Sequence, residues 1–253
     1  MIIRKSQAEI EKMARAGRVV RGCLDLLGRT IEPGITTKEL DRLAEKYIRS
    51  EGGIPTFKGY RGFPGSICAS PNDMVVHGIP GRVRLREGDI LGVDVGVTMD
   101  GYVADAASTF PVGEIAEDAQ RLLRVTQESL MKGIAQCRIG NRVGDISHAV
   151  QTHAEAHGYS VVQSMVGHGV GRDMHEDPQV PNFGPPGQGP ELREGMVLAI
   201  EPMINMGGFE VEIGADSWAV YTKDGSLSAH FEHTVAITKN GPLILTVAEV
   251  AGV

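Results

Sequence analysis

The sequence predicts an α+β fold in which two related halves share one core. A pair of helices precedes a group of strands twice along the chain, an order that differs from the alternation typical of a parallel sheet. Landmark residues also recur 106 positions apart, in the pairs Gly34 and Gly140, Leu40 and Ile146, and Gly52 and Gly158. We therefore predict a single domain made of two halves, at about residues 1–112 and 113–253.

Capping patterns and glycines define the predicted helices. Ser6 with Glu9, and Thr36 with Glu39, each place a hydroxyl three residues before a carboxylate, which is typical of the first turn of a helix. Apolar residues at helical spacing follow, and Pro or Gly residues end each run. The predicted helices span about 6–33, 36–52, 118–137 and 145–157.

Two acids, Asp94 and Asp105, lie on strands that a two-residue turn at Asp100-Gly101 would join. With such a turn, opposite positions sum to 201, so Asp105 faces Gly96. Asp94 is two residues from Gly96 and therefore lies on the same face of the hairpin. Diagonal neighbours of this kind have α-carbons ~7–8 Å apart, so both carboxylates can reach one cation.

A second pair of acids repeats this arrangement. The tetrapeptide Leu-Arg-Glu-Gly occurs at 85–88 and again at 192–195, and the same offset of 107 carries the first acid of the hairpin onto Glu201. We expect Glu201 in an apolar strand, followed by an Asp-Gly turn at 224–225 and then by Glu232.

These acids indicate a metal centre. A carboxylate in an apolar strand is unfavourable unless it is paired or bound to a metal. Four converging carboxylates would repel one another without a cation, and at least one pKa would rise. The alternative is that each acid is a solvated turn or edge residue, but the repeated context favours metal binding.

A histidine within the glycine-rich run 167–171 is a fifth candidate ligand. The glycines on both sides of His168 allow close backbone approach and disfavour a helix. The run lacks the spacing and the βαβ context of a dinucleotide site. His153 and His157, four residues apart on a predicted helix, could also bind metal, although their polar neighbours favour a solvated face.

The composition excludes several classes of function. The chain has 253 residues and a net charge of −7, which disfavours nucleic acid as the main partner. Three widely spaced cysteines, at 23, 68 and 137, predict reduced thiols. Because the sequence contains neither a signal peptide nor ~18 consecutive apolar residues, we expect a cytoplasmic protein that does not bind membranes.

Six motifs together resemble the type I methionine aminopeptidase family over nearly the whole chain. They are Val76-His77-Gly78-Ile79-Pro80, the Asp94 and Asp105 pair, Gly167-His168-Gly169-Val170-Gly171, His175-Glu176-Asp177-Pro178, Ile200-Glu201-Pro202-Met203 and Phe231-Glu232-His233-Thr234. The resemblance implies a pseudo-twofold pita-bread fold, an antiparallel curved sheet flanked by helices, with the metal centre on its inner face. It also implies removal of the initiator methionine from nascent proteins, with a small second residue preferred.

Residue by residue, the resemblance implies a centre of two divalent metal ions. Asp94 would hold one metal, and His168 with Glu201 would hold the other. Asp105 and Glu232 would bridge them. A ligand set rich in oxygen suits Mn²⁺, Fe²⁺ or Co²⁺.

The resemblance also assigns residues to the substrate. His77 and His175 would bind near the scissile bond, and Glu201 would act as general base for a metal-bridged hydroxide that attacks the first carbonyl. Apolar aromatic and sulfur side chains that suit a flexible thioether would form the methionine pocket, namely Phe57, Tyr60, Phe63, Cys68, Met174 and Trp218. Departures from the family pattern affect the pocket and not the ligands; they are Arg61, Met174 and His230.

Three alternatives differ in ways that the sequence addresses. Prolidase-like hydrolases of this fold carry a large N-terminal domain, whereas about 76 residues precede His77 here. Type II methionine aminopeptidases insert a helical subdomain between the residues equivalent to His175 and Glu201, and that interval is too short here. A metal-free binding paralogue is disfavoured by the five intact ligands. We expect a monomer that acts on nascent chains, with ribosome contact as an expectation from function alone.

Overall fold

The computed structural model describes residues 1–248, so the last five residues of the predicted second half lie outside the described residues. Its helices are α1 (Gln7–Thr30), α2 (Thr37–Ser50), α3 (Glu117–Ala135), α4 (Val143–Ala156) and a short 3-10 turn η1 (Tyr60–Gly62). The strands are β1 (Ile54–Pro55), β2 (Cys68–Pro71), β3 (Met74–Val76), β4 (Ile90–Met99), β5 (Tyr102–Pro111), β6 (Ser160–Val161), β7 (Gly167–Gly169), β8 (Glu176–Val180), β9 (Val197–Ile200), β10 (Met203–Asn205), β11 (Val211–Ile213), β12 (Val220–Thr222), β13 (Ser228–His230), β14 (His233–Thr238) and β15 (Gly241–Ile244).

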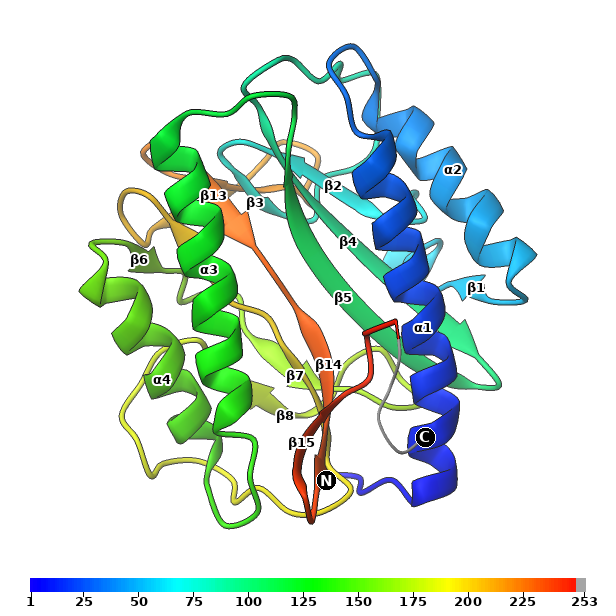
Figure 1. Cartoon of the computed structure of the whole chain (residues 1–253), viewed down its shortest axis with the longest axis vertical. Helices are drawn as coiled ribbons and strands as arrows, with labels where there is room; N and C mark the ends of the chain where they lie inside the picture. Colours follow the sequence, from blue (N-terminus) through cyan, green and yellow to red (C-terminus); the bar gives the residue numbers. More distant parts are fainter. Residues whose placement is uncertain (249–253) are drawn as a thin grey trace.

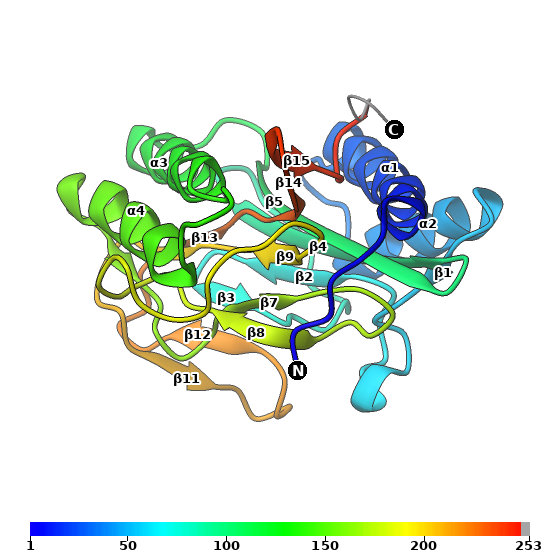
Figure 2. The ribbon, with the colours of Figure 1, turned by 90° about the horizontal axis from the view of Figure 1, so that it is seen from below.

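The four α-helices lie on one side of the strands, so the molecule has a helical layer over a curved β layer (Figure 2). Helices α1 and α2 cover the long β4–β5 hairpin. In the other half of the molecule, α3 packs against β9, β10 and β13, and α4 packs against β6 and β8 (Figure 1). Every described strand pair is antiparallel. The predicted α+β class with antiparallel sheets is therefore confirmed.

Capping residues begin the first two helices as predicted. Ser6 and Thr36 each accept a hydrogen bond from the backbone N–H three residues on, and the Glu9 and Glu39 carboxylates bond back to the cap. Such reciprocal bonds satisfy N–H groups that the helix itself leaves unpaired. Helices α3 and α4 begin one or two residues before the predicted 118 and 145 and also end slightly earlier.

The β4–β5 hairpin has the register that the sequence predicts. Asp105 pairs with Gly96, and Asp94 pairs with Ala107, so the two acids lie on one face. Asp100 and Gly101 both have a positive φ, +50° and +75°, as the two-residue turn of a tight hairpin requires.

The second pair of acids is arranged differently from the prediction. Strand β9 pairs with β14, but Glu201 and Glu232 lie just outside these strands, where the chain passes to or from a separate sheet made of β13, β10 and β6. The turn at 224–225 joins β12 to β13, which belong to different sheets, and is not a counterpart of the β4–β5 turn. The predicted analogy was wrong here because the strands β10 to β13 intervene between β9 and β14.

The first helix packs against the end of the described chain. Ile10 and Met13 of α1 are buried in one cluster with Leu245, which follows β15. A β-carbon on Gly17 would lie 2.1 Å from the Leu245 carbonyl oxygen, so only glycine permits this approach. The core of the N-terminal helix is thus completed by residues more than 200 positions later.

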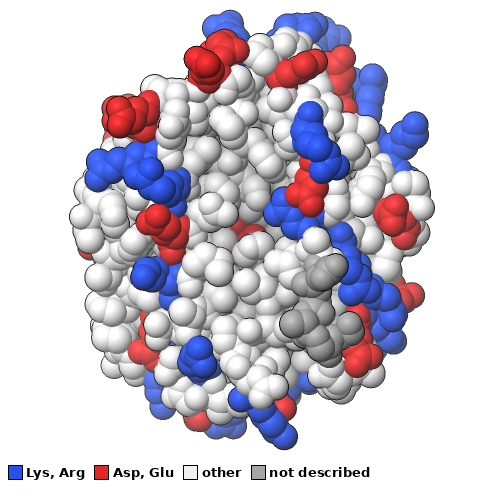
Figure 3. Space-filling model, viewed as in Figure 1, with Lys and Arg blue, Asp and Glu red and all other residues white. Residues whose placement is uncertain are grey.

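Charged side chains are spread over the surface, and Figure 3 shows Lys, Arg and acids interspersed around the edge of the helical face. The three cysteines are buried free thiols, as predicted. None of the described helices combines the length and apolarity needed to cross a membrane.

Candidate metal centre and active site

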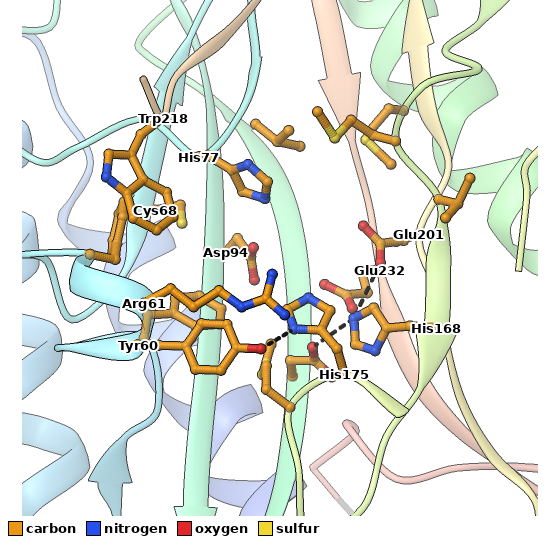
Figure 4. A pocket seen from close by; sticks show the side chains of 18 of the residues that line it. Tyr60, Arg61, Cys68, His77, Asp94, His168, His175, Glu201, Trp218 and Glu232 are labelled. Atoms are coloured by element: carbon orange, nitrogen blue, oxygen red, sulfur yellow. Dashed lines mark hydrogen bonds and ion pairs between the residues drawn. The ribbon is translucent and has the colours of Figure 1, made fainter. Parts of the chain in front are cut away.

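A cavity of about 270 Å³ lies between the β4–β5 hairpin and the strands β7, β9 and β14. Every residue that the sequence singles out as a ligand, a catalytic group or part of the methionine pocket lines it. Figure 4 shows Asp94 on one side of the cavity and Glu201, Glu232 and His168 on the other. The fold therefore brings together residues that are up to 175 positions apart in the chain, from Phe57 to Glu232.

The hairpin positions Asp105 through a contact with the other half of the chain. The Thr234 hydroxyl donates to Asp105 Oδ1 at 3.0 Å, and the Asp105 backbone N–H donates to the same hydroxyl at 3.0 Å. The backbone N–H of Glu232 donates to the Ala107 carbonyl at 2.9 Å. These bonds join β5 to the start of β14, so Asp105 and Glu232 face each other.

His168 reaches the acids from strand β7. A β-carbon on Gly167 would lie 2.4 Å from the Ala199 carbonyl oxygen, and one on Gly169 would lie 2.2 Å from the Asp177 carbonyl oxygen. The glycines therefore allow β9 and β8 to approach on either side of the imidazole. His168 Nδ1 bonds the Gly169 carbonyl at 2.9 Å, which leaves Nε2 facing the acids.

The ligand atoms lie at distances that a shared cation can bridge. His168 Nε2 is 3.5 Å from Glu201 Oε1 and 3.7 Å from Asp105 Oδ2. Atoms of Asp105, His168 and Glu232 all lie within 4.8 Å of one another. Burial lowers the pKa of His168, which keeps its imidazole in the neutral form that binds metals.

The ionised form of these acids is unfavourable in the absence of a cation. Burial raises the pKa of Asp94, Glu201 and Glu232 well above the usual range, and the charge of Asp105 adds to the effect at each. Within the described residues, Asp94 Oδ1 is buried and has no hydrogen-bond partner. A buried oxygen without a partner, beside three further acids and a neutral imidazole, fits divalent cations. The residues present therefore fit the metal ions that the sequence predicts.

The metal-free protein is expected to lose stability as the pH rises from about 4 to about 6. Burial raises the pKa of Asp105 from 3.8 to about 6, so the folded state retains a proton that the unfolded chain releases. The stability from this proton is complete below about pH 4 and is lost as pH passes the folded pKa, by on the order of 3 kcal/mol.

Thermal unfolding in chelator at several pH values measures this effect. Asp105→Asn should flatten the decline in melting temperature, and adding divalent cations to the wild type should offset it. Asp118→Asn, on the exposed surface of α3, is the matched control and should leave the decline unchanged. An equal slope in Asp105→Asn and wild-type protein would refute the assignment.

Two histidines lie at the substrate side of the cavity. The Tyr60 hydroxyl is 2.8 Å from His175 Nδ1, a hydrogen bond that Figure 4 marks. Burial lowers the pKa of His175 to about 4, so its ring is neutral at physiological pH. His77 has a positive φ of +61°, a left-handed conformation that non-glycine residues adopt rarely and often at functional sites.

Apolar side chains form one end of the cavity. Phe57, Phe63, Cys68 and Met174 are buried in one cluster, and the Phe63 and Trp218 rings pack edge to face with centroids 5.1 Å apart. A β-carbon on the cavity-side Gly96 would lie 2.6 Å from the Phe57 ring, so this glycine makes room for the aromatic floor. Tyr60 differs from the others because its hydroxyl contacts a histidine.

Two contacts at the acids were not assigned from the sequence. His230 is buried with Nε2 3.6 Å from Glu201 Oε2, and Thr234 holds Asp105. His230 and Glu232 are two residues apart, so strand alternation places them on the same face. From this pattern alone, a position of His230 near the acids could have been predicted. Nothing in the sequence pattern indicates that Thr234 bonds a residue 129 positions earlier.

Comparisons of the sequence with known families agree with this geometry. A model of metallopeptidase family M24 matches residues 11–239. The chain is 54% identical over 250 residues to a methionine aminopeptidase from Clostridium acetobutylicum, a match that covers 98% of this chain and all of that one.

Solved structures give the same result. A methionine aminopeptidase from Thermotoga maritima superposes with a TM-score of 0.96 at 46% identity, covering 97% of this chain and 99% of that chain. A prolidase from Pyrococcus furiosus superposes with a TM-score of 0.78 at 21% identity, covering 98% of this chain and 66% of that chain, and this likeness shows the fold alone.

Proposed function

Because the chain belongs to metallopeptidase family M24, we propose that it is a methionine aminopeptidase that removes the initiator methionine from nascent proteins. One observation carries the proposal: a carboxylate cluster lies beside an apolar cavity lined by aromatic and sulfur side chains. Release of methionine from a Met-Ala peptide is the direct test. The same peptide with an acetylated N-terminus is the control, and equal cleavage of both would contradict an aminopeptidase.

The proposed ligands are Asp94, Asp105, His168, Glu201 and Glu232, which together would hold two divalent cations, with Asp105 and Glu232 contributing to both. The close approach of Asp105, His168 and Glu232, with Glu201 Oε1 3.5 Å from His168 Nε2, supports this assignment. Mn²⁺, Fe²⁺ and Co²⁺ are the proposed metals because oxygen atoms dominate the ligand set. Such cations supply activation of a water molecule and polarisation of the scissile carbonyl.

The remaining steps fall to side chains around the cavity. Glu201 would accept the proton of the attacking water, since its carboxylate lies among the other proposed ligands, with Oε1 3.5 Å from His168 Nε2. If the Tyr60 hydroxyl donates to His175 Nδ1, the ring proton lies on Nε2. His175 would then donate to the carbonyl oxygen as negative charge develops there, and His77 would orient the same peptide group.

The chain resembles the type I enzymes within this family. Between β8 and β9, residues 181–196 form no helix, which contrasts with the helical insertion of type II enzymes. The complete ligand set also supports an enzyme over a metal-free binding paralogue.

The pocket is expected to favour N-terminal methionine strongly over lysine or glutamate. A charged side chain would exchange water for the apolar surfaces of Phe57, Phe63 and Trp218, which is costly. Comparing kcat/KM for Met-Ala, Lys-Ala and Glu-Ala peptides measures the preference. Similar values for Met-Ala and Lys-Ala would show that these side chains do not receive the first residue. A small second residue should also be favoured, as the family resemblance implies.

We also propose that residues 1–112 and 113–253 are two related halves. Gly34 N–H donates to the Leu85 carbonyl, and Gly140 N–H donates to the Leu192 carbonyl, which are equivalent positions at offsets of 106 and 107. The isolated bridges Thr36 to Arg84 and Arg142 to Glu191 are equivalent in the same way. The proposed working form is a cytoplasmic monomer that meets its substrate as the nascent chain leaves the ribosome.

A further inference from the structure

A second group of metal-binding side chains lies between the helices α3 and α4, away from the cavity. Glu128 of α3, His153 of α4 and His157, which caps the C-terminal end of α4, place one ligand atom each within 4.8 Å of one another. His153 Nε2 is 2.9 Å from Glu128 Oε2. None of the three residues lines the cavity of the active site.

His157 is oriented as a metal-ligating histidine usually is. His157 Nδ1 bonds the His153 carbonyl at 2.8 Å, so the lone pair of Nε2 remains available. In metal-ligating histidines, the ring nitrogen that does not bind the metal commonly donates to a carbonyl, which fixes the orientation of the ring. In a tetrahedral zinc site with bonds of about 2.0–2.1 Å, ligand atoms lie roughly 3.3 Å apart. At 2.9 Å, His153 Nε2 and Glu128 Oε2 are at hydrogen-bond distance, so an ion would replace this bond with only a small widening.

We propose that Glu128, His153 and His157 bind Zn²⁺ and thereby clamp α3 to α4. Two imidazoles and a carboxylate form a common three-residue zinc set, with water completing the tetrahedron. Two positively charged side chains near the site oppose the binding of a cation. Arg124 Nε is 3.9 Å from Glu128 Oε1, and the Arg121 side chain donates to the His157 carbonyl. The site is therefore weaker than a buried structural zinc site.

Equilibrium dialysis of the full chain against buffered Zn²⁺ tests this site. The double variant His153→Ala/His157→Ala should bind one Zn²⁺ fewer per chain than the wild type, and Glu128→Gln should weaken that site at least tenfold. His148→Ala is the matched control, because His148 lies on the same helix and contacts only Thr152 among the hydrogen bonds of its ring. Methionine release should be unchanged in all four proteins at saturating active-site metal.

Two results would overturn the clamp. Equal zinc stoichiometry in the wild type and the double histidine variant would show that no ion binds there. Unchanged affinity in Glu128→Gln would show that α3 takes no part. Because the readout is bound zinc, neither result depends on the proposed enzymatic function.

A different observation supports a second inference, which rests on the proposed function. Lys5 Nζ is 2.6 Å from Glu176 Oε2, and their side chains are only 3% and 5% exposed. The other carboxylate oxygen, Oε1, accepts backbone N–H groups from Arg172 at 3.0 Å and Asp173 at 3.4 Å. A β-carbon on Gly171 would lie 2.3 Å from Glu176 Oε1, so the loop closes tightly around the pair.

This loop carries Met174 and His175 into the cavity. A buried ion pair is weak evidence for stability, because desolvation offsets the attraction. Here the ion pair instead stabilises one conformation of the loop. Glu176 accepts two backbone N–H groups of the loop, and Lys5 neutralises the charge of Glu176. We infer that Lys5 is a positioning residue for His175.

Lys5→Met should lower kcat by roughly 10- to 100-fold, because a displacement of about 1 Å at a catalytic group has effects of this size. KM and metal content should stay near the wild-type values. Lys38→Met, which removes an exposed lysine, is the matched control. In a His175→Ala background, Lys5→Met should have little further effect on kcat, since the two act through one group.

The outcomes separate this inference from the proposed function. If the wild type does not release methionine, the proposed function fails. If the wild type is active and Lys5→Met retains its kcat, Lys5 does not position His175. If the two substitutions are additive, Lys5 acts on the fold in general and not through the histidine.

Discussion

Removal of divalent cations is expected to abolish methionine release, and Mn²⁺, Fe²⁺ or Co²⁺ should restore it. Without a cation, burial and mutual repulsion raise the pKa values of these acids strongly, so the ionised carboxylates are unfavourable there. Bound cations would stabilise the ionised form that the reaction needs. The assay follows dialysis against chelator, with residual metal measured by elemental analysis.

A single substitution tests the same centre without chelator. Asp94→Asn should reduce both bound metal and activity, because Asp94 Oδ1 is a buried oxygen that lacks a partner among the described residues. Asp118→Asn, exposed on α3, should change neither quantity. Full turnover by protein that elemental analysis finds free of metal would end the metallopeptidase assignment.

Two histidines with adjacent rings are expected to fail in different ways when replaced by alanine. The His168 and His175 rings have centroids 4.3 Å apart, yet only His168 faces the acids through Nε2 at 3.5–3.7 Å. His168→Ala should therefore weaken metal binding. His175→Ala should keep the metal and lower kcat by about 10²–10³-fold, because it removes a donor to the developing oxyanion.

Calorimetric titration of metal into both variants, with kcat measured at saturating metal, distinguishes the roles. His148→Ala, on the exposed face of α4, controls for the loss of a histidine elsewhere. Loss of metal from His175→Ala with retention in His168→Ala would reverse the assignment. Equal loss in both would place both imidazoles on the metal.

The sequence was sufficient where local rules set the geometry. A two-residue turn fixes the register of a hairpin, so the placement of Asp94 and Asp105 on one face of the hairpin could be predicted and is confirmed. The capping boxes at Ser6 and Thr36 act within one helical turn and were equally readable.

Long-range packing explains what could not be predicted. The chain leaves one sheet at Glu201 and returns from another at Glu232, and no local pattern encodes that change. Likewise, the bond of Tyr60 to His175 spans 115 positions and the pair of Lys5 with Glu176 spans 171. Such contacts follow from the assembled fold, so a lysine near the start of the chain gave no sign of its partner.

The packing of α1 against Leu245 has a consequence for synthesis of the protein itself. Contacts between distant parts of a chain slow folding, because a long loop must close before they form. At ~5–20 residues per second, α1 would leave the ribosome roughly 10–50 seconds before Leu245 is made. During that interval the apolar face of α1 lacks its final partner. The hairpin and α2 can cover part of it, so we expect folding in two phases, with the second after Leu245 has been made.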